Sequence, residues 1–106
     1  MSISARYRDI FSDLNHLLKE LSAGSSEEAD KALRQLEKAN EILSALVEQV
    51  GEIPQFKLEK ELTPVLLKAH GALDRGRLLF EENALGDRAA RVWEVEQRIY
   101  RLLNDL

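Results

Sequence analysis

The sequence predicts an all-α fold, an up-down antiparallel four-helix bundle whose third helix is kinked at a proline or split. Two observations lead to this prediction. Apolar residues recur at spacings of three and four along most of the chain, which is the pattern of amphipathic helices. Glycine, serine, asparagine and proline separate these stretches, and two of the connections are short enough to make neighbouring helices antiparallel. We expect residues 1–106 to form a single helical-bundle domain.

The first predicted helix covers about residues 2–21. Its apolar residues form a heptad seam, and two further residues widen that seam into a stripe that faces a core. The seam consists of Ile3, Tyr7, Ile10, Leu14, Leu17 and Leu21, with Phe11 and Leu18 beside it. Residues 22–25 end this helix, and the next one follows so closely that the two should pack antiparallel.

The second predicted helix covers residues 25–51 and has the clearest pattern. Ser25 and Glu28 have capping-box spacing, and Gly51 stands where a left-handed C′ position favours glycine. The inner stripe is small near its start and larger near its end: Ala29, Ala32, Leu36, Ala39, Leu43, Leu46 and Val50. Because small residues let neighbouring helices approach, we expect the bundle to be tightest near the start of this helix.

Residues 52–63 allow two interpretations. In the first, they form a loop, and Thr63 caps a helix whose first residue is Pro64. In the second, a helix begins at Pro54 and continues through Pro64 with a kink, because heptad spacing of apolar residues persists across Pro64. We predict an intermediate arrangement, with a short helical turn near residues 55–62 and a main third helix at residues 64–82.

The third and fourth helices complete the bundle. Gly76 falls on the inner face of the third helix, where it either lets another helix approach closely or is a weak spot costing roughly 1 kcal/mol relative to alanine. Residues 83–86 break the chain, and Asp87 is the expected N-cap of the fourth helix. The third helix should bury Leu66, Leu67, Ala69, Leu73 and Phe80, and the fourth carries Ala89, Val92, Trp93, Ile99, Leu102, Leu103 and Leu106.

Composition excludes several classes of protein. The chain has no cysteine, which excludes disulfides and thiolate metal sites, and its apolar runs are too short to cross a membrane. A net charge of −4 argues against nucleic acid as the main partner, because phosphate binding needs a basic field. No secretory signal pattern is present, so we expect a cytoplasmic protein. Phosphate loops, nucleophile elbows and dinucleotide fingerprints are missing, so we expect neither a cofactor nor catalysis.

Histidines and one carboxylate are the remaining candidates for chemistry. His16 and His70 each have a carboxylate four residues on, which can place two metal ligands on one helical face. His16 lies roughly 20 Å into its helix and His70 about 9 Å into its own, so we expect no shared metal site. Glu96 interrupts the apolar spacing of the fourth helix, and it marks either a partner groove or a boundary position beside Val95.

The first helix contains a pattern associated with partner binding. Residues 14–18 read LNHLL, which is the LxxLL pattern by which amphipathic helices dock into hydrophobic grooves. Leu14 and Leu17 also belong to the heptad seam, so the pattern serves either the core or a partner. The partner-binding candidates on this helix are Phe11, Asn15 and Leu18.

The fourth helix carries an arginine row, made of Arg88, Arg91, Arg98 and Arg101. Arginine favours bidentate pairing with carboxylates and is enriched in interfaces. The row is either a solvated face with Asp87–Arg91 and Glu94–Arg98 pairs or a surface that docks an acidic region of another protein.

One family resemblance arises on this helix. Arg88, Val92, Val95, Ile99 and Leu102 resemble the last helix of BAG domains, which are helical bundles that bind the ATPase domain of heat-shock chaperones. The resemblance is confined to this helix. Glutamine stands in the family pattern where this chain has Glu96, and the family has three long helices rather than four.

These patterns lead to one functional prediction with two alternatives. We expect a protein–protein interaction module, either a natural adaptor or an engineered binder. An engineered origin is considered because the helix start at residues 25–33 is as regular as that of a designed bundle. The first alternative is a self-associating structural bundle, a homodimer that uses an apolar patch of Phe80, Trp93 and Tyr100. The second is a BAG-like chaperone cofactor.

Overall fold

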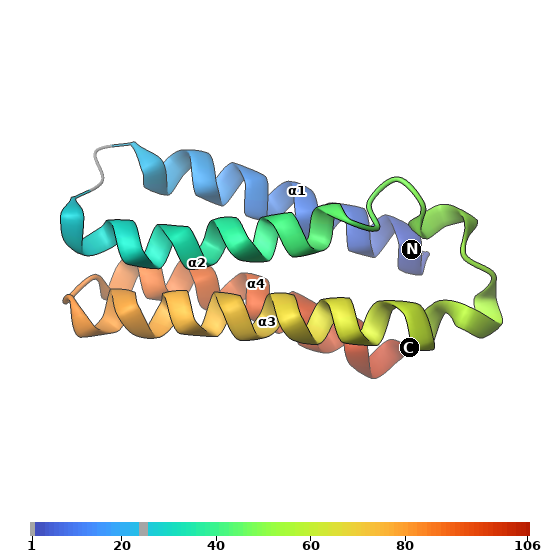
Figure 1. Ribbon diagram of the computed structural model, residues 1–106. Helices are drawn as coiled ribbons and strands as arrows, with labels where there is room; N and C mark the ends of the chain where they lie inside the picture. Colours follow the sequence, from blue (N-terminus) through green and yellow to red (C-terminus); the bar gives the residue numbers. More distant parts are fainter. Residues whose placement is uncertain (1, 24–25) are drawn as a thin grey trace.

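In a computed structural model, the chain is an all-α four-helix bundle, which confirms the predicted fold class (Figure 1). The structure describes residues 2–23 and 26–106, apart from the side chain of Glu28. The helices are α1 (Ile3–Ser22), α2 (Glu27–Ser44), α3 (Leu58–Glu82) and α4 (Gly86–Asp105). Two short 3-10 turns, η1 (Val50–Glu52) and η2 (Gln55–Lys57), join α2 to α3. Successive helices run in opposite directions, and the two termini lie at the same end (Figure 1).

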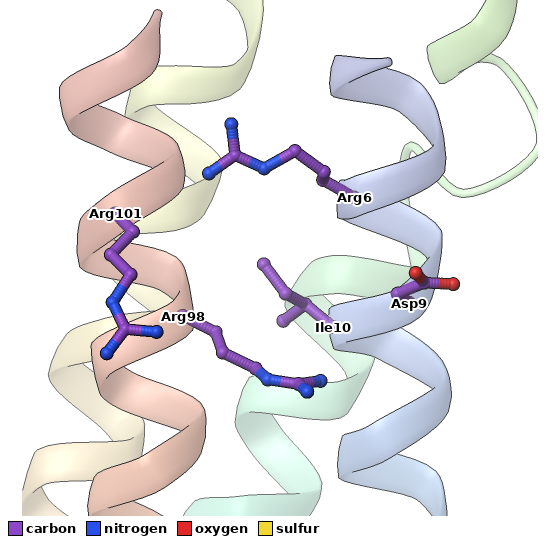
Figure 2. A pocket seen from close by; sticks show the side chains of 5 residues that line it. All are labelled: Arg6, Asp9, Ile10, Arg98 and Arg101. Atoms are coloured by element: carbon purple, nitrogen blue, oxygen red, sulfur yellow. The ribbon is translucent and has the colours of Figure 1, made fainter. Parts of the chain in front are cut away.

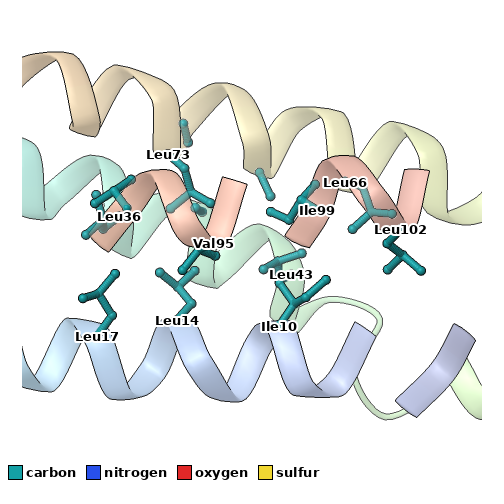
Figure 3. Packing of buried hydrophobic residues seen from close by; sticks show 14 of the residues in the cluster. Ile10, Leu14, Leu17, Leu36, Leu43, Leu66, Leu73, Val95, Ile99 and Leu102 are labelled. Carbon is teal, nitrogen blue, oxygen red and sulfur yellow. The ribbon is translucent and has the colours of Figure 1, made fainter. Parts of the chain in front are cut away.

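The core extends along the bundle and uses the predicted stripes. Figure 3 shows Leu14 and Leu17 of α1 directed towards Leu36 of α2 and Val95 of α4. On α3, the prediction is wrong for Leu67, which is 55% exposed, whereas Leu66 is fully buried. Adjacent residues differ by about 100° around a helix, so Leu66 and Leu67 do not share the inward direction.

The start of α2 is capped by Ser26, whose Oγ accepts a hydrogen bond from the Ala29 N–H at 3.4 Å. This serine hydroxyl satisfies one of the free N–H groups of the first turn. The predicted capping box of Ser25 and Glu28 lies outside the described residues.

The α-helical part of α2 ends at Ser44, so the prediction of a helix to residue 51 is wrong there. The cause lies in α1: the Tyr7 hydroxyl donates to the Leu43 carbonyl at 2.5 Å, and Arg8 Nε donates to the Val47 carbonyl at 3.1 Å. A regular helix would offer the Leu43 carbonyl to the Val47 N–H, which instead bonds to Ser44 at 3.4 Å.

Gly51 does not have the predicted left-handed conformation and lies inside η1. A Cβ atom at this position would lie 3.2 Å from Nη2 of Arg8. The glycine therefore leaves room for the arginine that bonds to Val47.

The third helix continues through Pro64, so the predicted break before Pro64 is wrong and the alternative of one helix across Pro64 is correct. Its expected start at Pro54 is wrong, because α3 begins at Leu58. η2 forms the helical turn expected after Pro54, and α3 begins directly behind it at Leu58. Pro64 and Lys60 are both exposed. The Lys60 carbonyl, which lacks its usual N–H donor, can therefore bond to water.

The predicted close approach of a helix at Gly76 is confirmed. A Cβ atom there would lie 2.5 Å from Cδ1 of Leu36 and 3.2 Å from the carbonyl oxygen of Ala32. Both neighbours belong to α2. Gly76 and Ala32 together let α2 and α3 approach near the alanine-rich start of α2.

Between α3 and α4 the chain turns through a Schellman motif. Ala84 has a φ of 58°, the Leu85 N–H bonds to the Phe80 carbonyl at 2.8 Å, and the Ala84 N–H bonds to the Glu81 carbonyl at 3.2 Å. α4 then begins at Gly86, so the prediction of Asp87 as N-cap is wrong. Asp87 lies in the first turn, where its charge interacts favourably with the helix dipole.

Candidate functional site

The seam between α1 and α4 carries a ladder of three ion pairs. Residues seven apart on α1 meet residues seven apart on α4, as expected for antiparallel helices with heptad spacing. The α1–α4 ion-pair ladder consists of Arg6–Asp105 at 2.7 Å, Glu20–Arg91 at 2.7 Å, and Asp13–Arg98. The acidic partners were not identified from the sequence, although the spacing of seven between Asp13 and Glu20 on α1 is visible in it.

Two of the four arginines in the predicted row belong to the α1–α4 ion-pair ladder, and two do not. Arg91 and Arg98 pair with α1 rather than with acidic residues of their own helix. Within residues 2–23 and 26–106, Arg101 has neither an ion pair nor a hydrogen bond, and it lines a pocket together with Arg98 and Arg6 (Figure 2). Arg88 lies apart from this group and lines another pocket, beside the turn between α3 and α4.

The candidate residues on α1 lie where this helix meets α2. Asn15 Oδ1 accepts a hydrogen bond from Asn40 Nδ2 at 2.7 Å. Phe11 and Leu18 are half-buried and pack against the core. Leu14 and Leu17 of the LxxLL pattern are buried, so the pattern contributes its inner leucines to the core.

A fully buried carboxylate lies between α3 and α4. Glu96 has no exposed surface, and within the described chain neither of its carboxylate oxygens has a hydrogen-bond partner. Its Oε1 lies 3.6 Å from Nε2 of His70, and its Oε2 lies 3.4 Å from Nε of Arg77. Burial, and the neighbouring Asp74, raise the pKa of Glu96 to about 8.

Arg77 binds the other acidic side chains that lie near Glu96. It donates two hydrogen bonds to Asp74 Oδ1, at 2.8 and 3.0 Å, and a third to Glu81 at 2.9 Å. These bonds to Arg77 hold the pKa of Asp74 below its ordinary value. At neutral pH Glu96 is therefore largely a neutral carboxyl group. Because it is fully buried, it cannot reach a substrate, and its effect is on the packing of α3 against α4.

Four large apolar side chains are exposed on the two helices that enclose this cluster. Trp93 and Tyr100 of α4 are 47% and 55% exposed, and Leu67 and Leu78 of α3 are 55% and 44% exposed. The Arg77 guanidinium lies 5.4 Å from the centre of the Trp93 ring and connects the two helices. We call the surface formed by Leu67, Leu78, Trp93, Tyr100 and Arg77 the α3/α4 face.

Phe80, which was expected to share a patch with Trp93 and Tyr100, is fully buried, so this part of the prediction is wrong. The Phe80 side chain lies on the inner face of α3 and packs in the core. The Phe80 backbone carbonyl accepts the Schellman hydrogen bond from the Leu85 N–H.

The two histidines lie in different surroundings. His16 is exposed on α1, whereas His70 contacts Glu96. In the described parts of the chain, no three His, Asp or Glu side chains are grouped so that they could hold a metal ion. None of the described helices combines the length and apolar character that a membrane span requires.

Comparisons with known proteins give no assignment. No family model, no curated protein and no solved structure matches the chain. The resemblance of the last helix to BAG domains therefore stays a prediction.

Proposed function

We propose that this protein is a protein–protein interaction module that binds its partner through the α3/α4 face. The observation that carries the proposal is the exposure of Trp93 and Tyr100, which lie seven residues apart and so point from the same side of α4. Aromatic residues and arginine are enriched in interfaces and dominate their binding energy. Leu67 and Leu78 are two further exposed apolar side chains, on α3.

Hydrogen bonds hold the Arg77 guanidinium of the α3/α4 face in place before any partner binds. Asp74 and Glu81 fix the Arg77 guanidinium, which in turn covers the Trp93 ring. An ordered arginine and aromatic pair loses little conformational freedom on binding, which favours affinity. A partner that buries this pair needs an apolar surface of its own.

Affinity capture with the whole chain tests the proposal. We expect Trp93→Ala and Tyr100→Ala each to weaken partner binding by about thirtyfold or more, as truncation of a central interface aromatic does. Phe56→Ala is the matched control, because Phe56 is 82% exposed but lies in η2, away from the α3/α4 face. Equal binding by all three variants would remove the α3/α4 face as the docking surface.

Self-association through the same face is the second candidate, because exposed aromatics of one copy can cover those of another. Light scattering separates the two functions. A tight dimer that Trp93→Ala converts to a monomer supports self-association, and a stable monomer supports a different protein as the partner.

Docking through the arginine row has less support. Arg91 and Arg98 already pair with carboxylates of α1, so much of their charge is compensated within the chain. The double variant Arg88→Glu, Arg101→Glu tests this mode without breaking the ladder. Loss of partner binding in this variant, together with normal binding by Trp93→Ala, would favour the arginine row.

The BAG-like and engineered alternatives are also proposals. The BAG-like function predicts binding to the ATPase domain of a heat-shock chaperone. Ala84 has a left-handed conformation, and the buried Glu96 carboxyl has no hydrogen-bond partner in the described chain. Both features depart from the rules of idealised design, which favours a natural origin.

A further inference from the structure

A series of close contacts leads from a buried carboxyl group to the α3/α4 face. Glu96 has no exposed surface, and its Oε2 lies 3.4 Å from Nε of Arg77. The same guanidinium lies 5.4 Å from the centre of the ring of Trp93, an exposed residue, and the two side chains line one pocket. A charge that appears on Glu96 therefore acts on a guanidinium that already lies over an exposed aromatic ring.

The hydrogen bonds of Arg77 leave its Nε–H group able to change partner. This group donates to Asp74 Oδ1 at 3.0 Å, while Nη2 donates to the same oxygen at 2.8 Å and Nη1 donates to Glu81 at 2.9 Å. Asp74 thus keeps one bond to Arg77 if the Nε–H group turns to Glu96. Both oxygens of Glu96 are buried without a hydrogen-bond partner in the described chain, so an ionised carboxylate at this position needs such a donor.

The charged surroundings of Glu96 come from α3. Among the described residues, the titratable or charged groups that face it are His70, Asp74 and Arg77. The charged groups of α1 that pair with α4 belong to the ion-pair ladder. Burial, and then Asp74, raise the pKa of Glu96 to about 8, although Arg77 opposes the rise. Glu96 therefore loses its proton just above neutral pH, beside the Arg77 guanidinium.

We propose that proton loss from Glu96 transfers the Arg77 Nε–H hydrogen bond from Asp74 to Glu96 and so changes the position of the guanidinium over the Trp93 ring. The proton passes to solvent, and only hydrogen bonds change. A hydrogen bond between a guanidinium and a carboxylate is about 2.7–2.9 Å long, so Arg77 moves towards Glu96 from the present 3.4 Å. The α3/α4 face then has a neutral-pH form and an alkaline form. An effect of this change on partner binding rests on the function proposed above.

Spectroscopy of the whole chain at a series of pH values tests the proposal. The chain has one tryptophan, so tryptophan fluorescence reports on Trp93 alone. We expect Trp93 emission and the NMR resonance of Arg77 Cζ to change together, with a midpoint at about pH 8. Glu96→Gln imitates the protonated carboxyl group, so both signals should keep their neutral-pH values throughout. Glu94→Gln, a substitution at an exposed position of the same helix, should leave the transition unchanged.

Arg77→Met separates this mechanism from a direct effect of Glu96 on Trp93. The NMR resonance of Glu96 Cδ records ionisation in each chain that retains Glu96. In Arg77→Met, Glu96 should ionise at higher pH, because Arg77 lowers its pKa, and Trp93 emission should no longer follow the ionisation. Arg77 Cζ that does not follow Glu96 in the unchanged chain, or Trp93 emission that still follows it in Arg77→Met, would overturn the proposal. These measurements need no partner, so their failure is distinct from a failure of the proposed function.

Discussion

At the residue scale, Ala84 ends α3 in a conformation that favours glycine. Its φ of 58° costs a residue with a side chain about 1 kcal/mol. We expect Ala84→Gly to raise the free energy of unfolding by about 0.5–1 kcal/mol after the entropy cost of glycine is subtracted. Thermal unfolding followed by circular dichroism measures this as an increase in Tm of several degrees, on the order of 4–8 °C per kcal/mol.

Two substitutions check this explanation. Ala84→Val should destabilise the chain, because a β-branched residue is strained at positive φ. Gly86→Ala should stabilise it by about 0.5 kcal/mol, since nothing lies within 4 Å of the new Cβ atom. A lower Tm for Ala84→Gly than for the unchanged chain would contradict the role assigned to Ala84.

Glu96 makes stability depend on pH. Its pKa rises from an ordinary value of 4.5 to about 8 in the folded chain, so between these values the folded state holds a proton that the unfolded state has lost. The stability that this bound proton contributes is therefore fully present below pH 4.5 and is lost as pH rises towards 8. Over this range the free energy of unfolding falls by up to about 1.4 kcal/mol per pH unit. We expect Glu96→Gln to remove this slope and to be more stable than the unchanged chain at pH 8.

Urea denaturation at a series of pH values measures the slope attributed to Glu96. Glu94→Gln is the control, because Glu94 is exposed on the same helix and its substitution should leave the slope in place. His70, Asp74 and Arg77 also face Glu96, and they remain unchanged in both variants. An unaltered slope in Glu96→Gln would show that another group sets the pH dependence.

At the element scale, the packing of α3 on α2 depends on one glycine. In Gly76→Ala the new Cβ would lie 2.5 Å from Cδ1 of Leu36 and 3.2 Å from the Ala32 carbonyl, so a side chain and the backbone of α2 must both shift. We expect a net loss of about 1–3 kcal/mol, because the strain exceeds the gain in helix propensity. Chemical denaturation measures the loss.

Gly71 in the same helix provides the matched control. A Cβ atom there would meet only Nη1 of Arg75, at an ordinary 3.6 Å. Gly71→Ala should therefore gain up to about 1 kcal/mol from helix propensity. Opposite signs for the two substitutions would establish that contact with α2, rather than glycine in a helix as such, determines the effect at position 76.

The elements also show how far the sequence determines the fold. Local patterns predicted the heptad seam of α1 and the inner position of Gly76, because both follow from helical periodicity. The end of α2 could not be predicted, since the Tyr7 hydroxyl that bonds to Leu43 comes from another helix. A left-handed residue was expected at Gly51 after α2, whereas it lies at Ala84 after α3, in a turn closed by two Schellman hydrogen bonds.

The candidate sites depend still more on pairings between helices. The arginine row was visible in the sequence, but the carboxylates that pair with Arg91 and Arg98 lie on α1. Their identity depends on the register between α1 and α4, which spacing within one helix does not fix. Glu96 was recognised as an interruption of the apolar pattern, whereas its burial beside Arg77 required the packing of α3 against α4.

At the scale of the whole molecule, the four helices are unequally held. α2 packs extensively on α3, and α3 on α4, whereas α1 makes fewer contacts with either neighbour. Polar contacts supplement the packing of α1: the Tyr7 hydroxyl bonds to Leu43, Asn15 bonds to Asn40, and the ion-pair ladder joins it to α4. Exposed ion pairs contribute only about 0–1 kcal/mol each, so they do not replace an extensive apolar interface.

This inequality predicts the order in which the bundle opens. We expect amide hydrogens of α1 to exchange through a local opening that requires less free energy than global unfolding, while those of α3 exchange only on global unfolding. Native-state hydrogen exchange measures both values. Tyr7→Phe removes the shorter hydrogen bond to the buried Leu43 carbonyl, which keeps only a 3.4 Å bond from the Leu46 N–H, and should cost about 1 kcal/mol. If α1 opens alone, the hydrogen bond from Tyr7 to Leu43 breaks with it, and the amide hydrogens in the last turn of α2 also become less protected. Equal opening free energies for α1 and α3 would instead show that the bundle unfolds as one cooperative unit.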